Sequence, residues 1–295
     1  MSAPASVAAN KGATTYLPLF LSLILLATSF VYLPGLRGGF LFDDSQTRIE
    51  YGFIHADTLT LESLRQAAGS FAAGGRQISM ASFFLNSYFL EAAPYSFKLV
   101  NLIVHLLNGL LIYFLTRLLL QSYADNLGRL KLPDWTPVAI TAAWLLNPME
   151  LTTVLYVVQR MTGLASFFIL GGLLAYAYGR QRQMQGKHGM AFIISGLLGG
   201  TALAYLSKEN GVLLVPFALL IEVIFYRFRK QGSGRDWRII WLVVILPLSG
   251  FLFLLFTYYS PHRYLAGYAS RDFSLHERLL TETRVIWLYI RLILL

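Results

Sequence analysis

Long apolar runs, separated by short polar, glycine or proline breaks, dominate the pattern of this sequence. The runs cover residues 16–34, 97–121, 135–146, 163–178, 190–206, 211–226, 239–259 and 284–295. About 20 apolar residues allow a helix to cross the hydrocarbon core of a bilayer. None of the runs alternates polar and apolar residues as a membrane β-strand does. The pattern therefore predicts an all-α polytopic membrane protein with about eight transmembrane helices.

The composition supports the same class. The 295 residues are 56% hydrophobic and 13% charged, with a mean hydropathy of +0.57, whereas a soluble domain carries about 25% charged residues. These values exclude a water-soluble enzyme, a DNA-binding domain and a disordered chain. The chain has no cysteine, which excludes a disulfide, a thiolate nucleophile and a cysteine-ligated zinc site.

The net charge of +9 is distributed unevenly between alternate connections. One set of connections contains the basic residues Lys11, Arg117, Arg129, Lys131, Arg180, Arg182, Lys187, Arg227, Arg229, Lys230, Arg235 and Arg238, with the acids Asp125, Asp134 and Asp236. Cytoplasmic loops of membrane proteins carry excess Lys and Arg. We therefore expect a cytoplasmic N-terminus, with the opposite face periplasmic in a bacterium or lumenal in a eukaryote. Binding of nucleic acid has no support, because these basic residues do not form one stripe.

The chain is expected to form a single membrane domain over residues 1–295. Its first span, 16–34, is followed by an external loop over 35–97, and the remaining spans occupy 97–295. Within the loop, the sequence predicts a helix near Thr60–Ala68, ended by Gly69. The apolar stretch 78–90 is too short for a span and fits a helix lying on the outer leaflet. Because the chain stops inside its last apolar run, we expect it to be the N-terminal part of a longer protein.

Ionisable side chains gather at the predicted external ends of the spans. They are Asp43, Asp44, Glu150, Arg160, Lys208, Glu209, His262, Arg263 and Arg284. Ionisable groups near lipid are costly, so their concentration on one face indicates a polar cavity. Asp43 and Asp44 suit a general base, because repulsion between adjacent carboxylates raises one pKa. They equally suit a divalent cation or a solvated turn.

Each of the other polar groups has a structural interpretation beside the functional one. Glu150 and Arg160 are suited either to an ion pair with each other or to contact with substrate. Lys208 with Glu209 is suited either to a functional role or to capping the outer end of a helix, with the lysine side chain extending to the lipid headgroups. The stripe of Asn101, His105 and Asn108 on one helix face is typical of interhelical hydrogen bonds. The inner-end residues Glu222, Arg227 and Arg229 are predicted to be interfacial anchors without chemistry.

Several short motifs follow one another in a recognisable order. They are Phe40-Leu41-Phe42-Asp43-Asp44, Arg76 with Ser79, Phe97 to His105, Asn147-Pro148, Val158-Gln159-Arg160-Met161-Thr162, Ser207-Lys208-Glu209 and Arg284-Val285-Ile286-Trp287-Leu288-Tyr289. Over residues 38–295 this set resembles the membrane portion of C-type (GT-C) glycosyltransferases. The transmembrane and tetratricopeptide-repeat O-mannosyltransferases and their bacterial relatives are the most similar type. The resemblance implies a GT-C-like helical bundle.

The resemblance also implies an activity and a set of site residues. The donor would be a sugar linked to a polyprenyl phosphate, and the acceptor a hydroxyl of a protein or glycan on the external face. Asp43 or Asp44 would be the general base of an inverting transfer, and Arg76, Arg160 and Lys208 would bind the donor phosphate. Supporting positions around the site would be Glu150, Glu209, His105, His262 and Arg284. No cofactor is required, although a divalent cation could bind at Asp43 and Asp44.

Two other classes of function remain open at this point. In a transporter or a flippase for lipid-linked sugars, the same ionisable groups would line a substrate path. Transporters place their site near the midplane between repeats, whereas here the polar groups gather on one face and no inverted repeat is evident. In a non-catalytic membrane scaffold, the polar groups would be purely structural.

Overall fold

The computed structural model describes residues 16–46, 58–71, 75–127, 132–232, 234–258, 268 and 271–294. These residues are mainly helical and contain no β-strand, apart from an isolated bridge between Arg229 and Arg235. The chain divides into two compact units, Met1–Asp236 and Trp237–Leu295. Each unit is described by itself.

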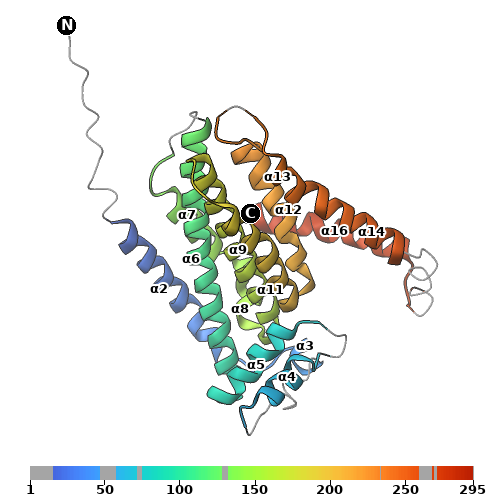
Figure 1. Cartoon of the computed structure of the whole chain (residues 1–295). Helices are drawn as coiled ribbons and strands as arrows, with labels where there is room; N and C mark the ends of the chain where they lie inside the picture. The colour runs from blue at the N-terminus through green and yellow to red at the C-terminus, as the bar shows by residue number, and fades with distance from the viewer. Residues whose placement is uncertain are drawn as a thin grey trace. The chain divides into compact units, whose positions relative to one another are not determined.

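The first unit contains the elements of the bundle and of the first loop (Figure 1). They are α2 (Leu17–Leu36), α3 (Asp43–Gln46), α4 (Leu61–Ala68), α5 (Gln77–Phe89), α6 (Pro94–Leu127), α7 (Thr136–Leu145), η1 (Pro148–Glu150), α8 (Leu151–Leu155), η2 (Val157–Gln159), α9 (Arg160–Met184), α10 (Met190–Ile194), η3 (Ser195–Gly199), α11 (Gly200–Ser207), η4 (Glu209–Leu213), α12 (Leu214–Ile221) and η5 (Glu222–Tyr226). The second unit contains α13 (Trp237–Ile240), η6 (Trp241–Ile245), α14 (Leu246–Tyr258) and α16 (Leu275–Leu294).

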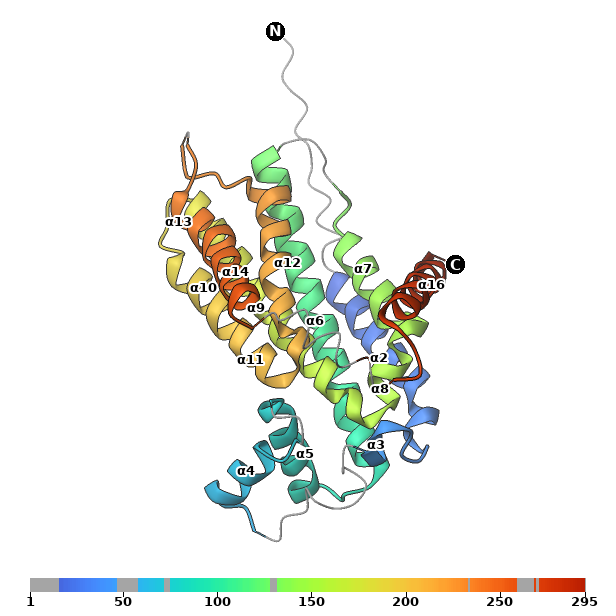
Figure 2. The same cartoon turned by 90° about the vertical axis from the view of Figure 1, so that its right-hand side faces the viewer.

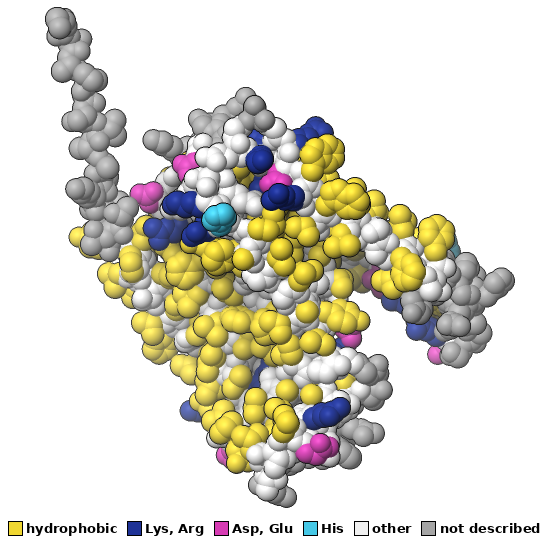
Figure 3. All heavy atoms as spheres, viewed as in Figure 1, with side chains coloured by type: hydrophobic (Ala, Val, Ile, Leu, Met, Phe, Trp, Pro, Cys, Tyr) yellow, Lys and Arg dark blue, Asp and Glu magenta, His cyan; other side chains and the backbone are white. Residues whose placement is uncertain are grey.

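Six helical segments are long and apolar enough to cross a membrane. They are Leu17–Leu36, Pro94–Asp125, Val157–Met184, Met190–Ser207, Glu209–Tyr226 and Trp237–Thr257. A seventh arises if Thr136–Leu145 and Pro148–Leu155, which are bent by 48°, are counted as one span. Hydrophobic side chains cover much of the face of the molecule seen in Figure 3. The chain is therefore an all-α polytopic membrane protein, as predicted.

The number of spans is smaller than the eight expected. Residues 284–294 of the last apolar run belong to α16, which is not among the candidate spans of the described residues. This helix carries Glu277, Arg278, Glu282, Arg284 and Arg291. Charged side chains are expensive at the centre of a bilayer, so the apolar end of α16 does not make the whole helix a span.

Helices α6 and α9 pack along each other at the centre of the first unit. Helix α11 packs on α9, while α2 and α7 pack on α6 (Figures 1 and 2). Glycines allow the close approach of α9 to the helix that follows it in the chain. A Cβ at Gly172 would lie 2.7 Å from the carbonyl oxygen of Gly196 and 2.5 Å from a side-chain carbon of Leu214. Small residues at such interfaces are typical of helix packing in membranes.

The first loop forms helices at one end of the bundle, where α2 ends and α6 begins (Figures 1 and 2). The predicted helix near 60–68 is confirmed. Thr60 caps α4 by accepting a hydrogen bond from the backbone N–H of Ser63, and Gly69 ends the helix, as expected for these residue types. Helix α5 covers the second predicted stretch. Whether either helix lies on a membrane leaflet stays a prediction.

Helix α5 is fixed to the bundle by an apolar core and a hydrogen bond. Buried side chains of α5, including Met80 and Phe83, pack in one cluster with Val157 and Met161 of the bundle. The Ser79 hydroxyl donates to the carbonyl oxygen of Ser207, at the end of α11, with a distance of 2.8 Å. Helix α5 therefore has a fixed position on this end of the bundle.

The polar stripe on α6 makes interhelical hydrogen bonds, which confirms its structural interpretation. The Asn108 amide donates to the Gly163 carbonyl oxygen at 3.0 Å, and Nε2 of His105 lies 3.1 Å from the Leu145 carbonyl oxygen. The Asn101 amide contacts carbonyl oxygens of residues 154, 156 and 157. All three side chains are buried, and they join α6 to its neighbours.

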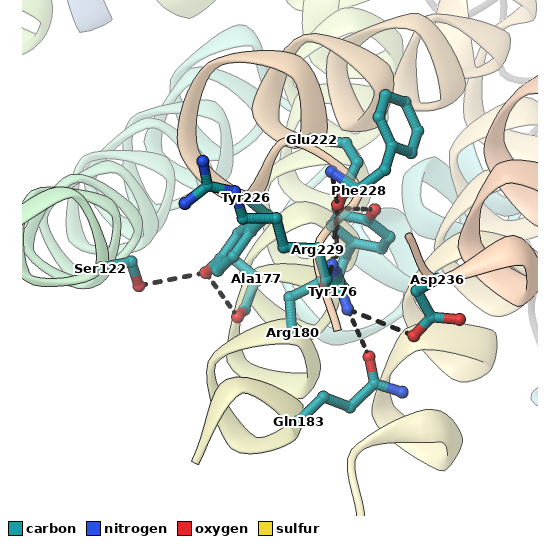
Figure 4. Close-up of polar contacts among 10 residues, drawn as sticks. All are labelled: Ser122, Tyr176, Ala177, Arg180, Gln183, Glu222, Tyr226, Phe228, Arg229 and Asp236. Carbon is teal, nitrogen blue, oxygen red and sulfur yellow. Dashed lines mark hydrogen bonds and ion pairs between the residues drawn. The ribbon is translucent and has the colours of Figure 1, made fainter. Parts of the chain in front are cut away.

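A second polar cluster lies near the C-terminal end of α9, around Arg180 (Figure 4). Arg180 and Glu222 form an ion pair of 2.8 Å, and neither side chain has exposed surface. The Glu222 carboxylate also accepts hydrogen bonds from the Tyr176 hydroxyl at 2.6 Å and the Phe228 N–H at 3.0 Å. The prediction that Glu222 is an interfacial anchor is wrong, because its carboxylate is enclosed between α9 and η5.

Candidate functional site

The two adjacent acids of the first loop have different environments. Asp44 is fully buried, and its carboxylate accepts hydrogen bonds from the N–H of Leu41 at 2.9 Å and of Val158 at 2.8 Å. Asp43 is exposed, and its backbone N–H donates to the Tyr156 hydroxyl at 2.8 Å. The preceding residue, Phe42, has a φ of +43°. Asp44 thus anchors the loop to η2, while the carboxylate of Asp43 is at the surface.

The electrostatic environment of Asp44 follows from this burial. Desolvation raises the pKa of its carboxyl group, and the backbone N–H donors and nearby Lys98 partly offset that rise. Lys98 is itself buried, and its ammonium donates to the carbonyl oxygens of Gly38 and Gly39 at 2.8 and 2.9 Å. The glycine-rich start of the loop is therefore held by a lysine from α6.

Arg76 directly precedes α5 and forms a two-pronged ion pair with Glu209. Its Nε and Nη2 donate to the Glu209 carboxylate oxygens Oε1 and Oε2, each at 3.0 Å. The side chains are 22% and 55% exposed. Arg76 has a φ of +60° and lies over the Phe71 ring at 4.3 Å. This left-handed backbone is uncommon for a residue other than glycine. The contacts of the Arg76 side chain with Glu209 and Phe71 stabilise it.

Lys208 lies beside this ion pair, directly after α11. Its ammonium donates to the Thr162 hydroxyl at 2.7 Å, and that hydroxyl donates to the Gln159 side chain at 2.6 Å. Burial and then repulsion by Arg76 lower the pKa of Lys208, whereas Glu209 acts in the opposite direction. Arg76, Lys208 and Glu209 therefore lie together at this end of the bundle.

A glycine, Gly211, allows the segment that carries Lys208 and Glu209 to pack closely against α11. A Cβ at Gly211 would lie 2.2 Å from the backbone carbon of Ala204 and from the backbone nitrogen of Tyr205. Real Cβ atoms do not make contacts this short, so a larger residue would displace η4. The position of both charged side chains depends on this close contact.

Arg160 was expected to contact a donor phosphate, but the structure places it in the interior, with 1% of its surface exposed. Its guanidinium donates to the side-chain oxygens of Asn86 and Asn101 at 2.7 and 2.8 Å, and to the carbonyl oxygens of Ser82 and Phe97 at 3.2 and 2.8 Å. The rings of Phe83 and Phe97 lie 4.7 and 5.5 Å away. Arg160 thus joins α5 to α6 and α9 and has almost no surface to offer a ligand.

The supporting positions named from the sequence are divided between different places. Glu209 contacts Arg76, as described. Glu150 lies in η1, and the hydrogen bonds of Arg160 go to the oxygens named above and not to Glu150. His105 is buried and stacks on Trp144 at 4.7 Å between ring centroids.

The two C-terminal candidates, His262 and Arg284, belong to the second part of the chain. His262 lies outside the described residues. Arg284 is an exposed residue of α16 in the second unit, which is described separately. The roles given to these two residues stay predictions.

The segment 156–162 connects the two parts of the candidate site. Tyr156 and Val158 contact the acidic pair, while Thr162 contacts Lys208 and Met161 contacts Arg76 through a sulfur–nitrogen distance of 3.4 Å. Thr162 lies in a motif noted from the sequence, but Tyr156 had no signal that could have identified it. No group of three or more His, Asp or Glu side chains within the described ranges is arranged for a metal ion.

Comparisons with known proteins give one informative match. No protein-family model matches the chain, and no solved structure matches it. A protein O-mannosyl-transferase of Caenorhabditis elegans is 23% identical over 240 residues, which are 78% of this chain and 31% of the relative. The chain thus spans less than a third of the length of that relative. The similarity indicates a distant relationship to a glycosyltransferase.

Proposed function

We propose that this chain is the membrane portion of a GT-C-type glycosyltransferase. It transfers a sugar from a polyprenyl-phosphate donor to a hydroxyl acceptor at the external face of the membrane. The relative is named for mannosyl transfer to protein, so mannose and a protein hydroxyl are the first sugar and acceptor to test. The main support is that Asp43, whose carboxylate is exposed, and the two cations Arg76 and Lys208 all contact one segment, residues 156–162, at one end of an apolar bundle.

The proton transfer is assigned to Asp43. The acceptor hydroxyl gives its proton to the Asp43 carboxylate while its oxygen attacks the anomeric carbon. The bond from that carbon to the phosphate oxygen breaks on the opposite face, so the configuration inverts. A general base contributes about 10²–10⁴-fold to the rate. Asp43 is preferred to Asp44, whose two carboxylate oxygens already accept backbone hydrogen bonds in a buried position.

The leaving phosphate is assigned to Arg76 and Lys208. A guanidinium binds carboxylate and phosphate with the same two-pronged geometry. The Glu209 carboxylate, which is more than half exposed, therefore occupies the position that a donor phosphate would take on Arg76. Lys208 adds a second positive charge as negative charge develops on the leaving phosphate. The polyprenyl tail stays among membrane lipids.

Arg160 has a positioning role in this proposal. Its hydrogen bonds to Asn86 and to the Ser82 carbonyl oxygen hold α5, whose first residue is preceded by Arg76. The proposed reaction needs no cofactor, because the cations of the chain can neutralise the phosphate. A divalent cation at the acidic pair stays a prediction.

Donor turnover tests this proposal. The chain, purified and reconstituted in vesicles, is incubated with polyprenyl-phosphate mannose and a serine- and threonine-containing peptide, and mass spectrometry follows loss of the donor and gain on the peptide. Asp43→Asn should lower turnover by about 10²–10⁴-fold. Glu62→Gln, at an exposed acid of α4, is the matched control and should be as active as the wild type. Equal turnover by both variants would contradict the assignment of the base.

A further inference from the structure

A groove on the first unit runs between α6 and α9, at the end away from the candidate site. It has a volume of about 560 Å³, and its apolar walls include Leu111, Phe114, Leu118 and Leu174. Both helices are candidate membrane spans, and Phe114 is 48% exposed. The groove therefore opens on the surface that lipid chains would contact.

A glycine forms part of this groove. A Cβ built on Gly171 of α9 would meet no atom within 4 Å. Neighbouring Gly172 differs from Gly171 in this respect, because a Cβ at Gly172 would collide with Leu214 and Gly196. The missing side chain at Gly171 is not required for helix packing, and its effect is to keep the groove open.

The groove is positively charged at one end. Arg117 and Gln121 of α6 line it there, together with Tyr178 of α9. Arg117 is exposed and makes no hydrogen bond or ion pair with another residue of the described ranges. Arg182 donates to the Tyr178 hydroxyl at 3.3 Å. The lining includes no acid. Figure 3 shows Lys and Arg side chains, with some Asp and Glu side chains among them, at this end beside the hydrophobic surface.

The depth of Arg117 suits a phospholipid headgroup. Lys98, which binds the first loop, and Arg117 are 19 residues apart on α6, which corresponds to about 29 Å along a helix. The hydrocarbon core of a bilayer is about 30 Å thick. Arg117 therefore lies near the leaflet opposite to the candidate site. A neighbouring cavity of about 330 Å³ also reaches Arg117 and Gln121, but Asp134 lines it, which makes it less suited to an anion.

We propose that the groove between α6 and α9 is a binding site for an acidic phospholipid of that opposite leaflet. The lipid phosphate contacts Arg117, with Arg182 contributing a second charge nearby. One acyl chain lies along the apolar walls over Gly171. This site is separate from the proposed transfer reaction and takes a lipid, not a sugar donor.

Retention of lipid by the purified chain tests the proposal. The protein is incorporated into nanodiscs of phosphatidylcholine with a minor share of phosphatidylglycerol and re-extracted in mild detergent, and native mass spectrometry counts each bound lipid. The wild type should retain phosphatidylglycerol in preference to phosphatidylcholine. Arg117→Gln should weaken that retention about fivefold, as expected for one cation near an anionic leaflet. Gly171→Leu should reduce retention of phosphatidylglycerol without any change of charge, because the leucine side chain fills the space of the acyl chain.

A matched control separates a site from general attraction. Lys187→Gln removes a positive charge from an exposed residue at the same end of the unit, and it should retain phosphatidylglycerol as the wild type does. Equal losses in Arg117→Gln and Lys187→Gln, or equal retention of the two lipids by the wild type, would overturn the proposal. If Arg117→Gln does not fold, Gly171→Leu decides the question, because its side chain replaces open space. Full retention by that variant would contradict a lipid in the groove.

Discussion

Substitution of Glu222 by Gln should strongly destabilise the protein. In the structure the carboxylate of Glu222 is held by Nε and Nη2 of Arg180 at 2.9 and 2.8 Å, by the Tyr176 hydroxyl and by the Phe228 N–H (Figure 4). Glutamine has nearly the same size, but it has no negative charge and only one acceptor oxygen. Arg180 then keeps a buried charge without its main partner.

The magnitude follows from this burial. Both side chains have 0% exposed surface, and loss of one member of a buried ion pair costs about 3–5 kcal/mol. Asp236, whose carboxylate lies 3.7 Å from Arg180, remains as a weaker partner, so we expect the lower end, about 3 kcal/mol. An exposed interfacial anchor, the role predicted from the sequence, would cost about 0.5 kcal/mol or less.

Reversible unfolding in mixed detergent micelles measures the difference. The free energy of unfolding of Glu222→Gln is compared with the wild type and with Glu62→Gln, which changes an exposed acid. A double variant, Arg180→Met with Glu222→Leu, should recover much of the loss, because it removes both charges and keeps the volume. A cost for Glu222→Gln no larger than that for Glu62→Gln would show that the buried ion pair with Arg180 does not stabilise the fold.

Three further predictions concern the candidate site. Burial raises the pKa of Asp44 above its ordinary 3.8. The free energy of unfolding should therefore fall as the pH rises from the pKa of Asp44 in the unfolded chain to its higher pKa in the folded protein. Unfolding of Asp44→Asn, measured across the acid range, should lack this dependence on pH. Glu209→Gln removes the carboxylate that raises the pKa of Lys208. The affinity for polyprenyl phosphate, measured as a function of pH, should therefore begin to fall at a lower alkaline pH than in the wild type. A fall at the same alkaline pH in both proteins would contradict this. Gly211→Ala places a Cβ 2.2 Å from backbone atoms of α11 and should lower donor turnover, whereas Gly171→Ala meets open space and should not; equal activities would show that the close contact of η4 is unimportant.

The helical framework could be predicted from local patterns. Six of the eight apolar runs correspond to candidate spans, and a seventh to the bent helix pair. The capping residue Thr60 and the stop at Gly69 predicted α4. The stripe on α6 predicted interhelical hydrogen bonds, because an amide or imidazole in an apolar helix must find a partner. These features depend on neighbouring residues, and a single sequence contains that information.

The site could be predicted only in part, because its contacts join distant residues. Arg76 and Glu209 are 133 positions apart, and Arg180 and Glu222 are 42 apart; no periodicity links such pairs. The pattern also treats Asp43 and its neighbour alike, although the left-handed backbone at position 42 precedes an exposed acid and a buried one. For the same reason the sequence does not distinguish a buried arginine, such as Arg160, from one that can contact a ligand.

The most direct test of the proposed donor site is an electron cryo-microscopy map of the protein with polyprenyl phosphate bound. We predict phosphate density within hydrogen-bonding distance of Arg76 and Lys208, with the Glu209 carboxylate displaced from the Arg76 guanidinium. We also expect the carboxylate of Asp43 on the same side of the bundle as the phosphate. A bound phosphate located elsewhere, with the Arg76–Glu209 ion pair intact, would contradict the proposed donor site.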